Sequence, residues 1–212
     1  MPSRIVILLR PGGRGSTSGA ADPLAAFRLA NVTGTLRLAQ QAVACGVRRL
    51  VLVSSIKVNG EQTAPGQPFT AADVPQPLDP YGISKYAVEL DLHNAREMFG
   101  LQYVIFRPHN VYGPRQLIRH NRQGFIGWFI RLAVEDGTIQ IYGDVSQLRD
   151  FVYVDDAVDA FLRAGASDQC NGEVYNYIEL GGDKGESDCA VIQPMIENCG
   201  IMNAVDSING DF

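Results

Sequence analysis

This sequence has few cysteines and histidines and no excess of positive charge, and each of these features argues against a class of protein. Four cysteines and three histidines among 212 residues, with no Cys-x-x-Cys pair, are too few and too scattered for a disulfide scaffold or a structural zinc site. We therefore expect reduced thiols and no metal. Acidic residues outnumber basic ones by 23 to 18, a net charge of −5. This argues against a nucleic-acid binder, because such binding relies on neutralising phosphates.

Long apolar runs are also absent. None approaches the roughly 18 residues that a membrane-spanning helix needs. The apolar run at 5–9 is followed by Pro11 and is too short for the core of a signal peptide. The sequence therefore predicts a cytoplasmic protein with no membrane contact. Its length and its hydrophobic content of 46% suit one α/β domain, or one and a fraction.

Short apolar runs alternate with amphipathic stretches along the chain. This alternation is typical of an α/β fold in which helices cover both faces of a parallel sheet. The run at 50–54 begins with four apolar residues, so we expect it at the centre of the sheet, parallel to its neighbours. Strands are predicted at 5–9, 50–54, 103–106, 139–142, 151–154 and 174–178. Helices are predicted at 23–45, 80–99, 124–135 and 155–166.

The helix boundaries carry local signals. Asp22-Pro23 and Asp79-Pro80 each join a capping carboxylate to a proline at the first helical position, and Asp155-Asp156 caps the last helix. Gly46 and Gly100 are placed to end the first two helices. The expected buried stripe of the first helix is Leu29, Val32, Leu36, Ala39 and Val43.

Tyr81 and Lys85 carry the strongest chemical signal. They are four residues apart, so a helix places them one turn from each other on one face. A phenol has an ordinary pKa near 10, and its use as a base at pH 7 costs about 4 kcal/mol. A nearby ammonium stabilises the phenolate and lowers this cost. Taken alone, the pair also fits a surface contact on an amphipathic helix.

Ser54 and Ser55 strengthen the chemical interpretation. They follow the central strand, and ligands bind at the carboxyl ends of the strands in open parallel sheets. A serine hydroxyl at this position could hydrogen-bond the oxygen that Tyr81 deprotonates. Alternatively, the two serines only cap the end of the strand.

Five segments together resemble the NAD-dependent epimerase/dehydratase family, a branch of the extended short-chain dehydrogenase/reductases typified by UDP-glucose 4-epimerase. Their order along the chain matches that of the family, and the resemblance spans roughly residues 22–178. The segments are Asn31–Thr35, Val53–Gly60, Asp79–Lys85, Arg107–Arg115 and Gly143–Asp156.

The resemblance implies a role for each matched residue. Tyr81 would be the acid/base, and Lys85 and Ser55 would be the other catalytic residues. The residues implied to contact the cofactor NAD are Asn31, Ser54, Tyr81, Lys85, Pro108 and His109. Ser55, Asn110 and Arg149 would hold the substrate, a nucleotide-sugar with a UDP-hexose as the expected class, and a guanidinium suits its diphosphate. Taken alone, Arg149 also fits a surface salt bridge. The side chains of Asn31 and Asn110 could instead hydrogen-bond the backbone of their own helix or loop.

The reaction implied by the resemblance is NAD-dependent epimerisation at carbon 4 of the sugar. Family dehydratases carry an acidic run where this chain has Ser55-Ile56-Lys57, because elimination needs an extra acid and base. The lack of a carboxylate in this tripeptide favours epimerisation, or simple keto reduction, over dehydration.

The glycine motif with which the family opens, Gly-x-x-Gly-x-x-Gly, is missing. In the family it lets a helix N-terminus bind the cofactor pyrophosphate, whereas Gly12-Gly13-Arg14-Gly15 lacks that spacing. We therefore expect an incomplete Rossmann-type parallel sheet, weak NAD binding and little activity from this chain alone. It would then be a fragment, the product of a truncated gene, or a non-catalytic remnant that binds a nucleotide-sugar or a partner chain.

Three regions are expected. Residues 1–110, with a contribution from 139–160, form a partial NAD-binding domain. Residues 111–180 form a partial substrate-binding region, and residues 181–212 form a weakly structured tail. An incomplete sheet would leave an edge unpaired in a monomer, so a homodimer is a candidate assembly.

Overall fold

The computed structural model describes residues 5–8, 21–63, 67, 69–116, 125–140 and 151–177. The expected tail at 181–212 and the candidate residue Arg149 lie outside these ranges. Within them, no helix is both long and apolar enough to cross a membrane. No group of three or more histidine, cysteine or acidic side chains in the described part of the chain is placed to hold a metal ion.

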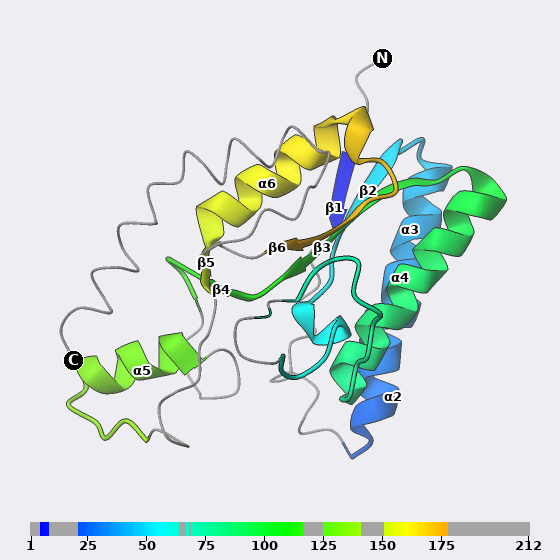
Figure 1. Ribbon diagram of the computed structural model, residues 1–212. Coiled ribbons are helices and arrows are strands. Elements are labelled where there is room, and N and C mark those ends of the chain that lie inside the picture. Colours follow the sequence, from blue (N-terminus) through cyan, green and yellow to red (C-terminus); the bar gives the residue numbers. More distant parts are fainter. Residues whose placement is uncertain are drawn as a thin grey trace.

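The main sheet has four parallel strands in the order β1-β2-β3-β6 (Figure 1). These are β1 (Ile5–Leu8), β2 (Arg49–Val53), β3 (Gln102–Pro108) and β6 (Val174–Tyr177). Since β2 pairs with β1 on one side and β3 on the other, the predicted central and parallel position of this strand is confirmed.

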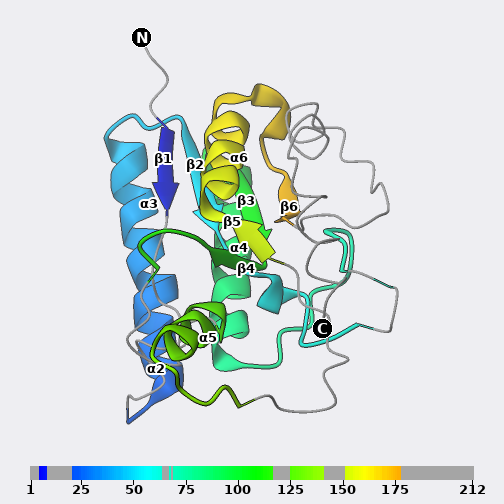
Figure 2. The same cartoon turned by 90° about the vertical axis from the view of Figure 1, so that its left-hand side faces the viewer.

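Helices cover both faces of the main sheet, which confirms the predicted α/β class. On one face lie α3 (Gly34–Ala44) and α4 (Pro80–Phe99), and on the other lies α6 (Val154–Ala166) (Figures 1 and 2). The helix α2 (Pro23–Phe27) and the π-helix η1 (Arg28–Thr33) lead into α3.

Side chains alternate along β2, and this divides the core into two apolar clusters. Leu50 and Leu52 join the cluster under α3 and α4, whereas Val51 joins the cluster under α6. Because successive side chains of a strand point to opposite faces, a continuously apolar strand needs a helical layer on each side. Leu50 and Val51 are both 0% exposed, so the apolar run is accounted for by burial on both faces.

The predicted helix signals at Asp22 and Asp79 are confirmed. The Asp22 carboxylate accepts a hydrogen bond from the Ala25 amide at 3.0 Å, and the Asp79 carboxylate accepts one from the Gly82 amide at 2.6 Å. Gly100 ends α4 with a φ of 68°, in the left-handed region that favours glycine.

The predicted buried stripe of the first helix is wrong at both ends. Leu29 and Val43 are 66% and 46% exposed. Ala39 is buried as predicted, and the other buried positions of η1 and α3 are Asn31, Thr35 and Ala42. For Leu29 the physical reason is the π-helix, since its i→i+5 hydrogen bonds put more residues into a turn than the α-helix that the stripe assumes.

The predicted cap of α6 is also wrong. The helix begins at Val154, its N-cap is Tyr153, and no side-chain capping bond is made. Asp155 and Asp156 lie in the first turn instead, where a carboxylate interacts favourably with the helix dipole.

A second, two-stranded parallel sheet joins β4 (Asn110–Tyr112) to β5 (Phe151–Tyr153). No strand was predicted where β4 lies. The predicted strand at 139–142 is not observed at 139–140, and 141–142 lie outside the described residues. The remaining elements are α5 (Phe125–Val134) and the short helices η2 (Ile56–Val58) and η3 (Asp168–Cys170). Cys170, in η3, is buried.

Candidate active site

Lys85 connects the start of α4 to the carboxyl end of β2. Its side chain is buried, with 5% of the residue exposed, and its Nζ donates a hydrogen bond to the Val53 carbonyl at 3.0 Å. The same Nζ lies 5.7 Å from the centroid of the Tyr81 ring. An ammonium group is therefore fixed beside a phenol at the edge of the sheet where ligands bind in open α/β folds.

The first turn of α4 is packed closely against the segment that follows β2. A Cβ atom added at Gly82 would lie 2.6 Å from the Lys57 carbonyl oxygen and 3.1 Å from Cβ of Pro77. Only glycine fits such an approach without movement of the backbone. The Tyr81 ring packs on Phe27, with 5.7 Å between the ring centroids, so both neighbours restrict where the phenol can lie.

The two serines at the end of β2 have different surroundings. Ser54 is buried, and its hydroxyl donates a short hydrogen bond to the Glu89 carboxylate. The hydroxyl oxygen of Ser55 accepts a weak hydrogen bond from the Lys57 amide at 3.3 Å and caps η2. Because the Ser54 hydroxyl proton is already donated to Glu89, Ser54 could only accept a hydrogen bond from a ligand. The predicted contact between Ser55 and the Tyr81 hydroxyl stays a prediction.

Asn31 lies where η1 meets the first turns of α4. Its side-chain amide donates to the Ser84 hydroxyl at 2.9 Å, and that hydroxyl donates to the Tyr81 carbonyl at 2.7 Å. The residue is 2% exposed, and its Oδ1 has no partner among the described residues. A buried acceptor of this kind could receive a hydrogen bond from a hydroxyl group of a ligand.

Pro108, His109 and Asn110 form the junction between the two sheets. Pro108 is the last residue of β3 and Asn110 is the first residue of β4. The Val111 amide donates to the His109 carbonyl at 3.0 Å, which shapes the turn between the strands. The three residues thus lie at the carboxyl end of β3, the strand next to β2, at the same edge of the sheet as Lys85.

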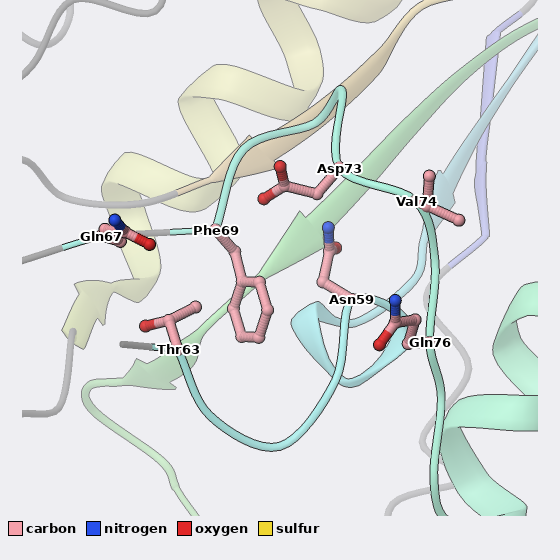
Figure 3. A pocket seen from close by; sticks show the side chains of 7 residues that line it. All are labelled: Asn59, Thr63, Gln67, Phe69, Asp73, Val74 and Gln76. Atoms are coloured by element: carbon pink, nitrogen blue, oxygen red, sulfur yellow. The ribbon is translucent and has the colours of Figure 1, made fainter. Parts of the chain in front are cut away.

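A polar pocket of about 520 Å³ lies beside the candidate site, in the segment that joins β2 to α4. Figure 3 shows the Phe69 ring among the polar side chains that line it. None of the predicted site residues is part of this lining. The lining residues are Asn59, Thr63, Gln67, Phe69, Asp73, Val74 and Gln76.

Sequence reasoning missed a buried ion pair between Glu89 and Arg107, together with its neighbour Asn59. Each of these three residues is 4% exposed or less. One signal was available, because Arg107 ends a run of apolar strand residues and a buried charge needs a partner. The identity of that partner was not readable from local sequence, since Glu89 is 18 residues away.

Comparison with known proteins gives both sugar-nucleotide epimerases and dehydratases as relatives. Over 137 residues, which are 64% of this chain and 42% of the relative, the chain is 44% identical to a UDP-glucose 4-epimerase from Mycolicibacterium smegmatis. Among solved structures, a UDP-glucose 4-epimerase from Thermotoga maritima with UDP-glucose matches with a TM-score of 0.73 and 29% identity, covering 82% of this chain and 55% of that one.

A third relative bears on the cofactor. A UDP-glucuronic acid 4-epimerase from Bacillus cereus, in complex with UDP-glucuronic acid and NAD, matches with a TM-score of 0.70 and 28% identity, covering 82% of this chain and 54% of that one. The match to the M. smegmatis relative covers 42% of that protein, so the chain spans less than half of its length. The model of the NAD dependent epimerase/dehydratase family matches residues 3–177, and this chain belongs to that family.

Proposed function

We propose that this chain carries the acid/base centre of a nucleotide-sugar epimerase that acts at carbon 4 of a UDP-hexose. The observation that carries the proposal is the buried Lys85 ammonium, bonded to the Val53 carbonyl and 5.7 Å from the centroid of the Tyr81 ring. This arrangement puts a phenol and a fixed positive charge at the ligand-binding edge of a parallel sheet.

Tyr81 is the acid/base in this proposal. The phenolate takes the proton of the sugar 4-hydroxyl, and the phenol returns a proton to the same oxygen when the reaction is completed. Lys85 stabilises the phenolate and so offsets part of the roughly 4 kcal/mol needed to ionise an ordinary phenol at pH 7. Ser55 hydrogen-bonds the same sugar oxygen and aligns it with Tyr81.

Bound NAD would supply the hydride acceptor and donor for carbon 4 of the sugar. The chain's own contribution is to bind and orient the cofactor. The proposed contacts of the cofactor are Asn31, Ser54, Tyr81, Lys85, Pro108 and His109. The proposed substrate contacts are Ser55, Asn110 and Arg149.

The proposed domain assignment follows the same division. Residues 1–110, together with 139–160, belong to the NAD-binding part, and 111–180 belong to the substrate-binding part. The packing of α6 over β2 and β3 supports the contribution of the later segment to the first part.

A second candidate is a nucleotide-sugar-binding protein without catalysis. It is favoured by the lack of a Gly-x-x-Gly-x-x-Gly motif in the sequence, because that motif holds the cofactor pyrophosphate. Dehydration is disfavoured because Ser55-Ile56-Lys57 supplies no carboxylate.

Turnover of UDP-galactose to UDP-glucose, measured at high protein concentration and with excess NAD, tests the proposal. We expect slow conversion that falls at least about 100-fold in Tyr81→Phe, in line with the loss of one general acid/base. The matched control is Tyr86→Phe on the same helix, which should keep the wild-type rate. Conversion that survives Tyr81→Phe would refute the proposed role, and the absence of conversion in the wild-type chain would favour the binding protein.

A further inference from the structure

Glu89 of α4 and Arg107 of β3 form a buried ion pair with fork geometry. Arg107 Nη2 donates to Glu89 Oε2 at 2.6 Å, and Arg107 Nε lies 3.1 and 3.2 Å from the two carboxylate oxygens. The side chains are only 5% and 4% exposed. Such two-point contacts fix the relative orientation of the two groups as well as their distance.

The ion pair is the centre of a larger network. The Ser54 hydroxyl donates to the other oxygen of the Glu89 carboxylate. Arg107 Nη1 donates to Asn59 Oδ1 at 3.2 Å, and Asn59 Nδ2 donates to the Thr70 carbonyl at 3.0 Å. One connected set of hydrogen bonds therefore joins the end of β2, the segment after η2, the helix α4 and the end of β3.

Three of the four segments in this network carry a residue of the proposed site close to the network residue. Ser54 precedes Ser55, and Arg107 precedes Pro108 and His109. Glu89 lies one helical turn after Lys85 and two turns after Tyr81, on the same face of α4. The ion pair thus lies where the elements that bear the acid/base, the serine and the histidine converge.

Stability alone is a weak explanation for such a pair. Taking two charges out of water carries a large desolvation cost, and apolar residues of similar volume are often equally stable or more stable in their place. What apolar residues cannot supply is the directional link to Ser54 and Asn59.

We propose that Glu89 and Arg107 are positioning residues, which hold Ser55 and His109 in register with Tyr81 and Lys85. This inference rests on the function proposed above. The pair touches neither substrate nor cofactor in this account and acts through the backbone and the neighbouring residues.

The test compares the double variant Glu89→Leu/Arg107→Met with the wild-type chain. The matched control is Asp159→Leu/Arg163→Met, which removes an ion pair from the surface of α6 whose side chains are 47% and 55% exposed. Both variants are measured by thermal unfolding, by kcat and KM for UDP-galactose, and by ¹H–¹⁵N NMR of the ligand-free chain.

We expect the buried-pair variant to stay folded, with kcat reduced at least tenfold and KM changed less than threefold. The amide signals of Ser55, Lys85 and His109 should shift, whereas the control should match the wild-type chain at these positions. A folded buried-pair variant with wild-type kcat and unshifted Ser55 and His109 signals would overturn the inference.

If the double variant does not fold, Glu89→Gln decides the question, since it keeps the shape and the acceptor oxygen and removes the charge. A wild-type kcat and spectrum in Glu89→Gln would overturn the inference, and a lowered kcat with shifted Ser55 and His109 signals would support it. Tyr81→Phe separates a failure of the proposed function from a failure of the positioning role. If it leaves turnover unchanged, the proposed function fails. If it abolishes turnover while the pair variants stay active, only the positioning role fails.

Discussion

At the scale of single residues, the Lys85 ammonium makes the difference between an ordinary tyrosine and a candidate acid/base. The Lys85 Nζ donates a hydrogen bond to the Val53 carbonyl, which holds the positive charge at the end of β2. A hydrogen bond to the main chain also places this charge independently of side-chain rotamers elsewhere.

Lys85→Met should therefore lower turnover about 100-fold while the chain stays folded. The physical reason is that the phenolate loses its stabilising charge, and general acid/base effects are worth about 10²- to 10⁴-fold. The pH–rate profile of Lys85→Met should also shift to higher pH, because Tyr81 ionises less readily without the neighbouring positive charge. An unshifted profile with the same kcat would show that Lys85 does not tune the phenol.

Asp168 gives a second prediction at this scale, through the pH dependence of stability. Hydrogen bonds from Arg49 and Arg48 hold the pKa of the Asp168 carboxyl below its ordinary value of 3.8. A lowered pKa in the folded state stabilises the fold above the unfolded pKa of about 4, and this contribution disappears as the pH falls through the folded pKa. Because the carboxylate is exposed, the contribution is small.

The measurement is urea unfolding of the wild-type chain and of Asp168→Asn between pH 7 and pH 2. The wild-type chain should be the more stable of the two above about pH 5. The difference should vanish at the acid end of the range. A difference that stays constant down to pH 2 would mean that the carboxylate charge is not what stabilises this contact.

At the scale of elements, the contact between α4 and η2 determines where Tyr81 lies. The close approach of Gly82 to the Lys57 carbonyl implies that a methyl group at position 82 pushes the helix away from the segment that holds Ser55. Gly82→Ala should therefore destabilise the fold by about 1–3 kcal/mol, the usual effect of overpacking, and should lower turnover as well.

Gly46→Ala is the matched comparison for this prediction. Gly46 has a φ of 74°, and a Cβ there would meet no atom within 4 Å, so alanine brings backbone strain of about 1 kcal/mol without a clash. Thermal unfolding and kcat measured on both variants separate the two effects. Equal loss of turnover in both would contradict a specific role for the contact between α4 and η2.

Most elements of the fold could be predicted from the sequence because their signals are local. The apolar run of β2 and the caps at Asp22 and Asp79 are of this kind. The π-helix at 28–33 was not predictable in this way, since it changes the number of residues per turn without a glycine or proline to mark it. As a result, Leu29 was expected to be buried and is exposed.

The candidate site also has a part that could be predicted from the sequence and a part that could not. Tyr81 and Lys85 could be paired from their spacing alone, because helical geometry fixes that contact. The pairing of Glu89 with Arg107 depends on how α4 packs against β3, and no periodicity encodes it. The pairing of β4 with β5 could not be predicted for the same reason, because the two strands are far apart in the chain.

At the scale of the whole molecule, we expect this chain to bind NAD weakly. Asn31 and Lys85 are proposed contacts of the cofactor, but the given sequence holds no Gly-x-x-Gly-x-x-Gly motif for the pyrophosphate. A loosely held nicotinamide forfeits much of the roughly 7–11 kcal/mol that good positioning can supply. Isothermal titration should therefore show weak affinity, and no NAD should survive purification. Tight, stoichiometric retention of NAD would contradict this prediction.

The proposed role of Tyr81 can be tested by a crystal structure of the chain with NAD and UDP-galactose at high concentration. We expect the Tyr81 hydroxyl to lie about 2.6–3.2 Å from the sugar 4-oxygen, the range of a general acid/base contact. The Ser55 hydroxyl should contact the same oxygen. A Tyr81 hydroxyl directed into solvent, or a sugar bound instead in the pocket around Asn59 and Phe69, would contradict the claim.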